Sequence, residues 1–313
     1  MEVKVKVGVI GVGVMGKLHL RVYRELGVEL VGVADTDFKK AEKVAAQYGT
    51  KVYSDNEELL EQGLDAVSIA VPTSQHKVVA LAAIRRGIHL LVEKPIADSI
   101  ENAQEIVAEA KSRHVKLMIG YLERFNPAVK KLKQIIDEGA LGKLVCLSAR
   151  RVAPFVPRVS DVGIIVDSGT HDIDVIRYLI GNECTSIAAQ VTRYKNVDGD
   201  AAMILLGFGD VAATIEVNWY NPQRVRSLTV TGTIGIAYLD YIKQEVEVHS
   251  AEQTAVLLIE KAEPLKLELE HFLDCIETNK EPLVSGYDSI KVLEIAIKAG
   301  QISMSRSSDE PQK

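Results

Sequence analysis

The sequence lacks the features that mark membrane, secreted and nucleic-acid-binding proteins. Its 313 residues contain no run of about 18 apolar residues, so we expect no transmembrane helix. No basic segment leads into a long apolar one, so we expect no signal peptide. Only three cysteines occur, without metal-ligand spacing, which favours free thiols in a reducing cytoplasm. The formal net charge of −6 argues against nucleic acid as a partner. We therefore expect a cytoplasmic protein with a small-molecule substrate.

Internal repeats and low-complexity segments are also absent, and residues 1–121 alternate regularly between strand and helix patterns. The short runs of Val, Ile and Leu suit parallel strands that are buried on both faces. We expect strands at 5–10, 28–34, 51–53, 65–71, 88–92 and 116–120, and helices at 15–26, 37–48, 55–61, 75–86 and 99–114. Strands joined by crossover helices predict an α/β Rossmann domain, a doubly wound parallel sheet that spans 1–121.

The pattern changes after residue 121. We expect helices at 126–138, 168–180, 264–278 and 289–304, and strands at 143–152, 185–195, 201–207, 211–219, 225–232, 235–240 and 244–249. In "VAATIEVNW" (211–219) apolar and polar residues alternate, as in an antiparallel strand with one buried face. Residues 122–313 therefore predict an α+β domain with a large, mostly antiparallel open sheet. Because the helices suffice to cover only one face, we expect a homodimer or homotetramer through the other.

A glycine-rich loop follows the first strand. "GVIGVGVMG" places Gly11, Gly13 and Gly16 in the pattern G-x-G-x-x-G, and Val14 and Met15 complete the turn into the helix. This context predicts a loop that binds the pyrophosphate of a dinucleotide.

Asp35 ends the next strand, where a carboxylate can accept hydrogen bonds from the adenosine ribose. Asp37 follows it and no arginine stands beside it, so NAD is favoured over NADP. A plain strand-to-helix turn and FAD are the alternatives.

Chemically active side chains follow two later strands. Strand 65–71 runs into Pro72, Thr73 and His76, and strand 88–92 runs into Glu93, Lys94 and Pro95. Ligands of such sheets bind beyond the carboxyl ends of the strands, so these residues are candidates for cofactor contact. Lys94 fits a position near the nicotinamide, or alternatively an ordinary exposed lysine.

The stretch "IIVDSGTHDID" (164–174) spaces Asp167 and His171 one helical turn apart. Three interpretations fit this spacing: a surface ion pair, a divalent metal site that also uses Asp172, and an acid–base pair. Oxidation of an alcohol by NAD needs a base for the hydroxyl proton and needs no metal, which favours the third interpretation.

In these stretches the sequence resembles the Gfo/Idh/MocA family of NAD(P)-dependent oxidoreductases. The matching segments are "GVIGVGVMGKLHL", "GVADTD", "DAVSIAVPTSQH", "HLLVEKPIA" and "DSGTHDIDVIRYLIG", in the family's order. The resemblance implies that Lys94 reaches both cofactor and substrate, and that the Lys94–Pro95 bond is cis. It also implies that His171 is the general base, that Asp167 orients it, and that His76 lines the cofactor loop.

Two further segments, "YLERFNPAVKKL" and "RRVAPFVPRVSDVGIIVDSGTHDID", resemble the family branch that oxidises the 3-hydroxyl of UDP-linked N-acetylamino sugars. Arginines there suit a diphosphate because guanidinium groups bind phosphate oxygens bidentately. Arg150 and Arg151 are weaker candidates because strand alternation sends them to opposite faces. The expected substrate contacts are Lys94, Arg124, Asn126, Arg158, His171 and Asp172.

Two other functions of the protein stay open. A dehydrogenase of a free sugar, cyclitol or diol is the first, and a non-catalytic NAD-binding regulator is the second. Many family members carry several glycines before the aspartate, whereas here only Gly163 does so in "SDVGIIVDSG", which weakens inference from simple inositol or glucose dehydrogenases.

Overall fold

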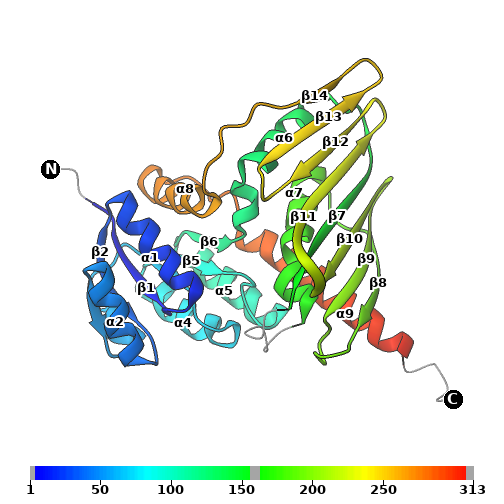
Figure 1. Ribbon diagram of the computed structural model, residues 1–313. Helices are drawn as coiled ribbons and strands as arrows, with labels where there is room; N and C mark the ends of the chain where they lie inside the picture. Colours follow the sequence, from blue (N-terminus) through cyan, green and yellow to red (C-terminus); the bar gives the residue numbers. More distant parts are fainter. Residues whose placement is uncertain (1–3, 156–162, 308–313) are drawn as a thin grey trace. The chain divides into compact units, whose positions relative to one another are not determined.

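A computed structural model describes residues 4–155 and 163–307, which form two compact units (Figure 1). The first unit comprises residues 1–122 and 265–290, and the second comprises 123–264 and 291–313. We expected all of 122–313 in one domain, whereas 265–290 groups with the first unit. Within that unit Met118, on an edge strand of the first sheet, forms an antiparallel bridge with Ser285.

The first unit is the expected doubly wound parallel sheet, with strand order β3-β2-β1-β4-β5-β6. The strands are β1 (Lys6–Ile10), β2 (Glu29–Ala34), β3 (Lys51–Tyr53), β4 (Ala66–Ile69), β5 (His89–Glu93) and β6 (Leu117–Gly120). The helices are α1 (Val14–Leu26), α2 (Phe38–Tyr48), α3 (Asn56–Leu60), α4 (His76–Arg85), α5 (Ile100–Ser112) and α8 (Pro264–Thr278), with short 3₁₀ turns η1 (Thr73–Gln75) and η2 (Leu122–Phe125). The strand order reverses between β1 and β4, and ligands of such sheets bind at that point.

The second unit is built on an eight-stranded sheet of order β14-β13-β12-β11-β7-β10-β9-β8, in which β7 and β10 pair in parallel and the other neighbours are antiparallel. Its strands are β7 (Leu144–Pro154), β8 (Ser186–Thr192), β9 (Ala201–Phe208), β10 (Val211–Asn218), β11 (Tyr220–Gly232), β12 (Gly235–Asp240), β13 (Glu245–Ser250) and β14 (Thr254–Val256). Its helical elements are α6 (Pro127–Asp137), the π-helical turn η3 (Ile165–Gly169), α7 (Thr170–Ile180) and most of α9 (Gly286–Ser307).

One face of this sheet carries the core of the second unit. A row of paired residues crosses the sheet from β8 to β13 and is buried throughout: Ala189, Ile204, Ile215, Ala149, Leu228, Leu239 and Val246. Helix α7 packs against β7 and β10, and α6 packs against β12 and β13 (Figure 1). Alternation along the strands therefore sends one set of apolar residues to the buried face and a mixture of polar and apolar residues to the other.

The structure also contains elements that the sequence pattern did not predict. Strand β14 and the π-helical turn η3 were not expected, and β11 begins at Tyr220, five residues before the expected start at 225. Among the residues that the structure describes, no helix is long and apolar enough to cross a bilayer.

Candidate active site

The glycine loop between β1 and α1 has the backbone geometry that dinucleotide binding requires. Gly11 has a φ of 91°, and a Cβ there would lie 2.5 Å from the carbonyl oxygen of Ala70. A Cβ on Gly16 would lie 1.8 Å from the carbonyl oxygen of Gly11, so only glycine lets α1 approach the loop. A Cβ on Gly13 would meet nothing within 4 Å, which leaves open space at the N-terminus of α1. This arrangement fits a pyrophosphate held by the N–H groups of the first helical turn.

The expected neighbours of the pyrophosphate and the ribose lie around this loop. Val14 is exposed and Met15 is half-buried in the first turn of α1. The Asp35 carboxylate accepts hydrogen bonds from the backbone N–H groups of Val12 (2.7 Å) and Asp37 (2.9 Å). A carboxylate has about four lone-pair sites, so ribose hydroxyls can bind in addition. Asp35 thus braces the glycine loop and presents negative charge where NADP carries its extra phosphate.

The segment after β4 places three expected cofactor residues in different environments. Pro72 is exposed and Thr73 is half-buried in η1, as a cofactor contact needs. His76 is buried: its ring nitrogens lie 2.9 Å from the carbonyl oxygen of Pro95 and 3.0 Å from that of Val71. Burial lowers the pKa of His76, and a neutral ring can donate to only one of these two carbonyl oxygens. That His76 lines the cofactor loop stays a prediction; in the structure its ring is buried between two loops.

In the segment at the end of β5, Lys94 is less buried than the residues on either side of it. Lys94 is half-buried, whereas Glu93 and Pro95 on either side are buried. Glu93 Oε1 lies 3.0 Å from Nε2 of the buried His19, so the carboxylate expected to contact the cofactor is occupied inside the unit. The Lys94–Pro95 peptide bond is cis, which confirms that prediction. In this segment part of the Lys94 side chain is exposed and can reach a ligand.

In the second unit, Asp167 and His171 lie on consecutive helical turns. Asp167 belongs to the π-helical turn η3, and His171 is the second residue of α7. Both side chains are half-buried, and Asp167 accepts a hydrogen bond from the Ser168 hydroxyl (2.9 Å). Single π-helical turns occur frequently at functional sites. A partly exposed carboxylate and imidazole on one helical segment can move a proton to and from a ligand.

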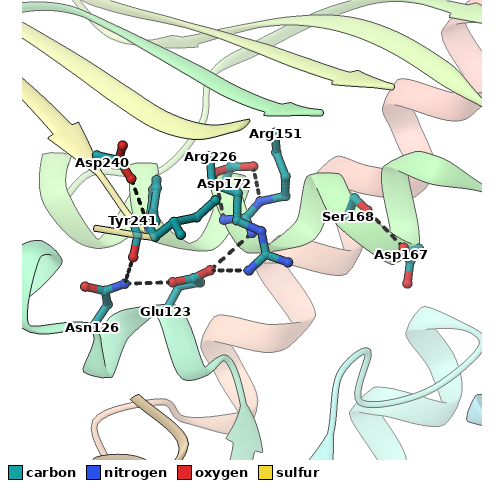
Figure 2. A network of polar contacts seen from close by, with 10 residues as sticks. Glu123, Asn126, Arg151, Asp167, Ser168, Asp172, Arg226, Asp240 and Tyr241 are labelled. Carbon is teal, nitrogen blue, oxygen red and sulfur yellow. Dashed lines mark hydrogen bonds and ion pairs between the residues drawn. The ribbon is translucent and has the colours of Figure 1, made fainter. Parts of the chain in front are cut away.

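Asp172 and Asp174 follow directly in the sequence, but their side chains form ion pairs inside the second unit. Both oxygens of Asp172 accept from Arg151, at 2.7 and 3.2 Å (Figure 2). Both oxygens of Asp174 accept from Arg124, at 2.8 and 2.7 Å. The four side chains are buried. Burial raises the pKa of the Asp172 carboxyl, and the guanidinium of Arg151 opposes that rise. The substrate contacts of Arg124 and Asp172 stay predictions. In the structure Arg124 pairs with Asp174 and Asp172 pairs with Arg151, as buried charges require partners.

Asn126 is likewise used inside the second unit. Its Oδ1 accepts from the N–H of Ala128 at the start of α6, and its Nδ2 donates to Tyr241 O (3.0 Å) and to Glu123 (3.2 Å). Glu123 also accepts from Arg151 (3.1 Å) and from Arg226 (3.3 Å) (Figure 2). The amide expected to contact a sugar is a helix cap, which is a common role for asparagine before proline-led helices.

The remaining candidates are the two arginines Arg150 and Arg158 and the possible ligands of a metal ion. Arg150 lies on the opposite face of β7 from Arg151, as expected, where it is exposed and pairs with Glu216 (2.8 Å). Arg158 lies outside the described residues. Among the described residues, no group of three or more His, Cys, Asp or Glu side chains is arranged to hold a metal ion.

Two groups of polar residues that are buried or partly buried were missed by the sequence reasoning. One joins Tyr23, Ser68 and His19 to Glu93 in the first unit, and the other joins Glu123 to Arg226 in the second. The available signal for the first was helical spacing: His19 and Tyr23 are four residues apart on a helix that has a buried face.

Comparisons with known proteins agree with both units. The oxidoreductase family model with an NAD-binding Rossmann fold, GFO/IDH/MocA, matches residues 5–121, and the model of the GFO/IDH/MocA C-terminal domain matches residues 129–238. The scyllo-inositol 2-dehydrogenase (NAD⁺) of Bacillus subtilis is 31% identical, covering 96% of this chain and 94% of that protein. The UDP-N-acetylglucosamine 3-dehydrogenase of Acidithiobacillus ferrooxidans is 30% identical, covering 95% of this chain and 96% of that protein. A solved structure of that enzyme superimposes with a TM-score of 0.90, at 28% identity, covering 96% of this chain and 98% of that chain.

Proposed function

The chain belongs to the Gfo/Idh/MocA family of NAD-binding oxidoreductases, and within it we propose that this protein oxidises the 3-hydroxyl of a UDP-linked N-acetylamino sugar to the 3-keto sugar. The family is one of dehydrogenases that act on sugar and cyclitol hydroxyls, and relatives of both kinds match nearly the whole chain. The nucleotide-sugar substrate is supported by the sequence segments at 121–132 and 150–174 and by the superposition with the UDP-N-acetylglucosamine enzyme.

The observation that carries the proposal is the contrast among neighbouring acidic residues. Asp172 and Asp174 are buried and paired with arginines, whereas Asp167 and His171 remain half-buried. Asp167 and His171 are therefore the ionisable side chains of this stretch that keep partial exposure. The partly exposed pair is the one suited to meet a substrate.

The chemistry assigns one task to each residue. When bound, NAD supplies the hydride acceptor. His171 takes the hydroxyl proton as general base, because a histidine has an unperturbed pKa of about 6.5, near neutral pH. Asp167 orients the imidazole and stabilises its protonated form. Lys94 polarises the oxygen that becomes the carbonyl.

The test is a substrate panel with mass-spectrometric detection of the keto product. Purified protein and NAD are incubated with UDP-N-acetylglucosamine, other UDP-sugars, and free sugars and cyclitols. A keto product from the UDP-linked amino sugar alone supports the proposal, and a product from a free cyclitol alone refutes the substrate assignment. Detection by mass matters because a cofactor recycled in place gives no absorbance change.

His171→Asn tests the general base. Turnover is expected to fall by about 100-fold or more, since general base catalysis contributes about 10²–10⁴-fold, while NAD binding is unchanged. His249→Asn is a matched control, because His249 lies on β13 of the same unit and pairs with Glu247. Normal turnover by His171→Asn would show that the base is assigned to the wrong residue.

A free cyclitol or sugar is the second candidate, and a specific observation favours it. Arg124, Arg150 and Arg151 each pair with a carboxylate within the second unit. A diphosphate is recognised best by guanidinium groups that do not already hold a carboxylate. The same panel distinguishes the two candidates.

A further inference from the structure

Two buried histidines hold the residues on either side of Lys94. Nε2 of His19 lies 3.0 Å from the Glu93 carboxylate, and Nδ1 of His76 lies 2.9 Å from the carbonyl oxygen of Pro95. Lys94 itself is half-buried between them. The backbone of the lysine is therefore fixed from both sides while its side chain stays accessible.

A line of buried polar groups lies behind His19. The Tyr23 hydroxyl lies 2.8 Å from Ser68 Oγ, and Ser68 Oγ lies 3.0 Å from Nδ1 of His19. Because a carboxylate oxygen only accepts, Nε2 of His19 is the donor to Glu93. This line of hydrogen bonds therefore ends on the residue before Lys94.

The Glu93 carboxylate is also confined by its other neighbours. A Cβ on Gly120 of β6 would lie 3.2 Å from all three carboxyl atoms, so the carboxylate fills the space that a side chain would take. Its second oxygen accepts from the backbone N–H of Lys94 at 3.3 Å. A shift of Glu93 would therefore move the Lys94 backbone.

His19 also connects this segment to the glycine loop. It lies on α1, the helix that begins at Val14 beside the open space at Gly13. The same helix thus borders the expected pyrophosphate position and holds the segment that carries Lys94.

We propose that His19 is a positioning residue that holds Lys94 at a fixed place relative to the dinucleotide, through its hydrogen bond to Glu93. The inference rests on the proposed function in one respect, the role of Lys94 at the reacting oxygen. His19 itself touches no substrate and takes part in no proton transfer.

The kinetic test compares His19→Leu with His19→Gln. Leu removes the donor to Glu93, whereas the Gln amide can still donate from about the same place. His19→Leu is expected to lower kcat by about 100-fold, with the Kd for NAD within about twofold of the wild type, because a misplacement of about 1 Å costs that much. His19→Gln is expected to recover most of the loss. A purely structural role would instead lower the folded fraction and NAD binding together.

A second readout needs no turnover. Limited acetylation, mapped by mass spectrometry, measures the reactivity of Lys94, with Lys243 as an exposed reference. His19→Leu is expected to change the Lys94 rate by about threefold or more. His89→Leu is the matched control, because His89 starts the strand that Glu93 ends, and its ring accepts a hydrogen bond from the Lys116 N–H. That variant is expected to leave Lys94 reactivity unchanged.

The outcomes separate this inference from the proposed function. A folded His19→Leu variant with wild-type kcat and wild-type Lys94 reactivity overturns the inference. If the wild type oxidises nothing in the panel, the proposed function fails, and the acetylation result still decides the positioning role. If His19→Leu does not fold, Ser68→Ala replaces it, since that variant removes the partner of Nδ1 and its unchanged Lys94 reactivity would overturn the inference.

Discussion

At the scale of single residues, Arg150 and Arg151 show that strand alternation determines how much an ion pair contributes to the free energy of unfolding. Arg151 lies inside the second unit and is bound bidentately by Asp172, with Glu123 nearby. Arg150 lies on the other face and pairs with Glu216, which is also partly exposed. Removing one partner of a buried pair costs about 3–5 kcal/mol, whereas an exposed pair contributes about 0–1 kcal/mol.

We therefore expect Arg151→Met to lower the free energy of unfolding by about 3–5 kcal/mol, since Asp172 would keep a buried charge without its partner. Arg150→Met is the matched control and should cost less than about 1 kcal/mol. The single tryptophan, Trp219, lies in the same unit, so its fluorescence during urea unfolding reports on this part of the chain. Equal urea midpoints for both variants would contradict the assignment. Adding Asp172→Leu to Arg151→Met should restore part of the loss, because it removes the unpaired charge.

The acidic and amide side chains of the second unit show what a single sequence cannot predict. Asp167 and His171 are predicted as a catalytic pair because their spacing and residue types indicate acid–base chemistry. Asp172 and Asn126 have equally suitable side chains, and only the fold shows that Arg151 and the start of α6 use them. The pairing of distant residues depends on strand register, which no local pattern in one sequence encodes.

At the scale of elements, the glycine loop combines two different requirements for glycine. At Gly16 the backbone of Gly11 leaves no room for a side chain. At Gly13 there is room in the protein, and the absent side chain leaves space for a ligand. A side chain at Gly16 would therefore disturb the fold, whereas a side chain at Gly13 would disturb cofactor binding alone.

Gly13→Ala is expected to change stability by less than about 0.5 kcal/mol while raising the Kd for NAD about tenfold, which is about 1.4 kcal/mol. Gly16→Ala should lower both the thermal midpoint and NAD affinity, since its Cβ would lie 1.8 Å from the Gly11 carbonyl oxygen. Calorimetric NAD titration and thermal unfolding of both variants measure the difference. Wild-type NAD affinity in Gly13→Ala would place the pyrophosphate elsewhere.

Elements with a strong period were predictable, and the exceptions have physical causes. The parallel strands and amphipathic helices of the first unit follow from their hydrophobic periods. At Ile165–Gly169 the sequence predicts a loop and the start of an α-helix, and the structure has a π-helical turn. A single turn with hydrogen bonds from residue i to i+5 has no period that a sequence pattern can show. Strand β14 has three residues, too few for an alternation to be visible.

At the scale of the whole molecule, one face of the eight-stranded sheet carries several exposed apolar side chains. The row opposite the buried one contains Ala188, Leu205, Thr214, Ser148, Thr229, Tyr238, Glu247 and Val256. Leu205, Tyr238 and Val256 are 49%, 45% and 70% exposed. A broad face that mixes apolar and small polar residues suits a symmetric contact between copies of one chain. We propose that this face forms the interface of a homodimer, or of one contact within a homotetramer.

Leu205→Glu tests this interface. A C2 contact places the substituted residue in the interface twice, so the new charge is expected to raise the dissociation constant about 100-fold or more, which is about 2.7 kcal/mol. Leu258→Glu is the matched control, because Leu258 is 97% exposed and follows β14 rather than lying in this row. Sedimentation velocity should give a multiple of 34.3 kDa for the wild type and for Leu258→Glu, and a monomer for Leu205→Glu with an unchanged thermal midpoint. A wild type that sediments as a monomer at micromolar concentration would exclude the interface, and an oligomer unaffected by Leu205→Glu would move it to another face.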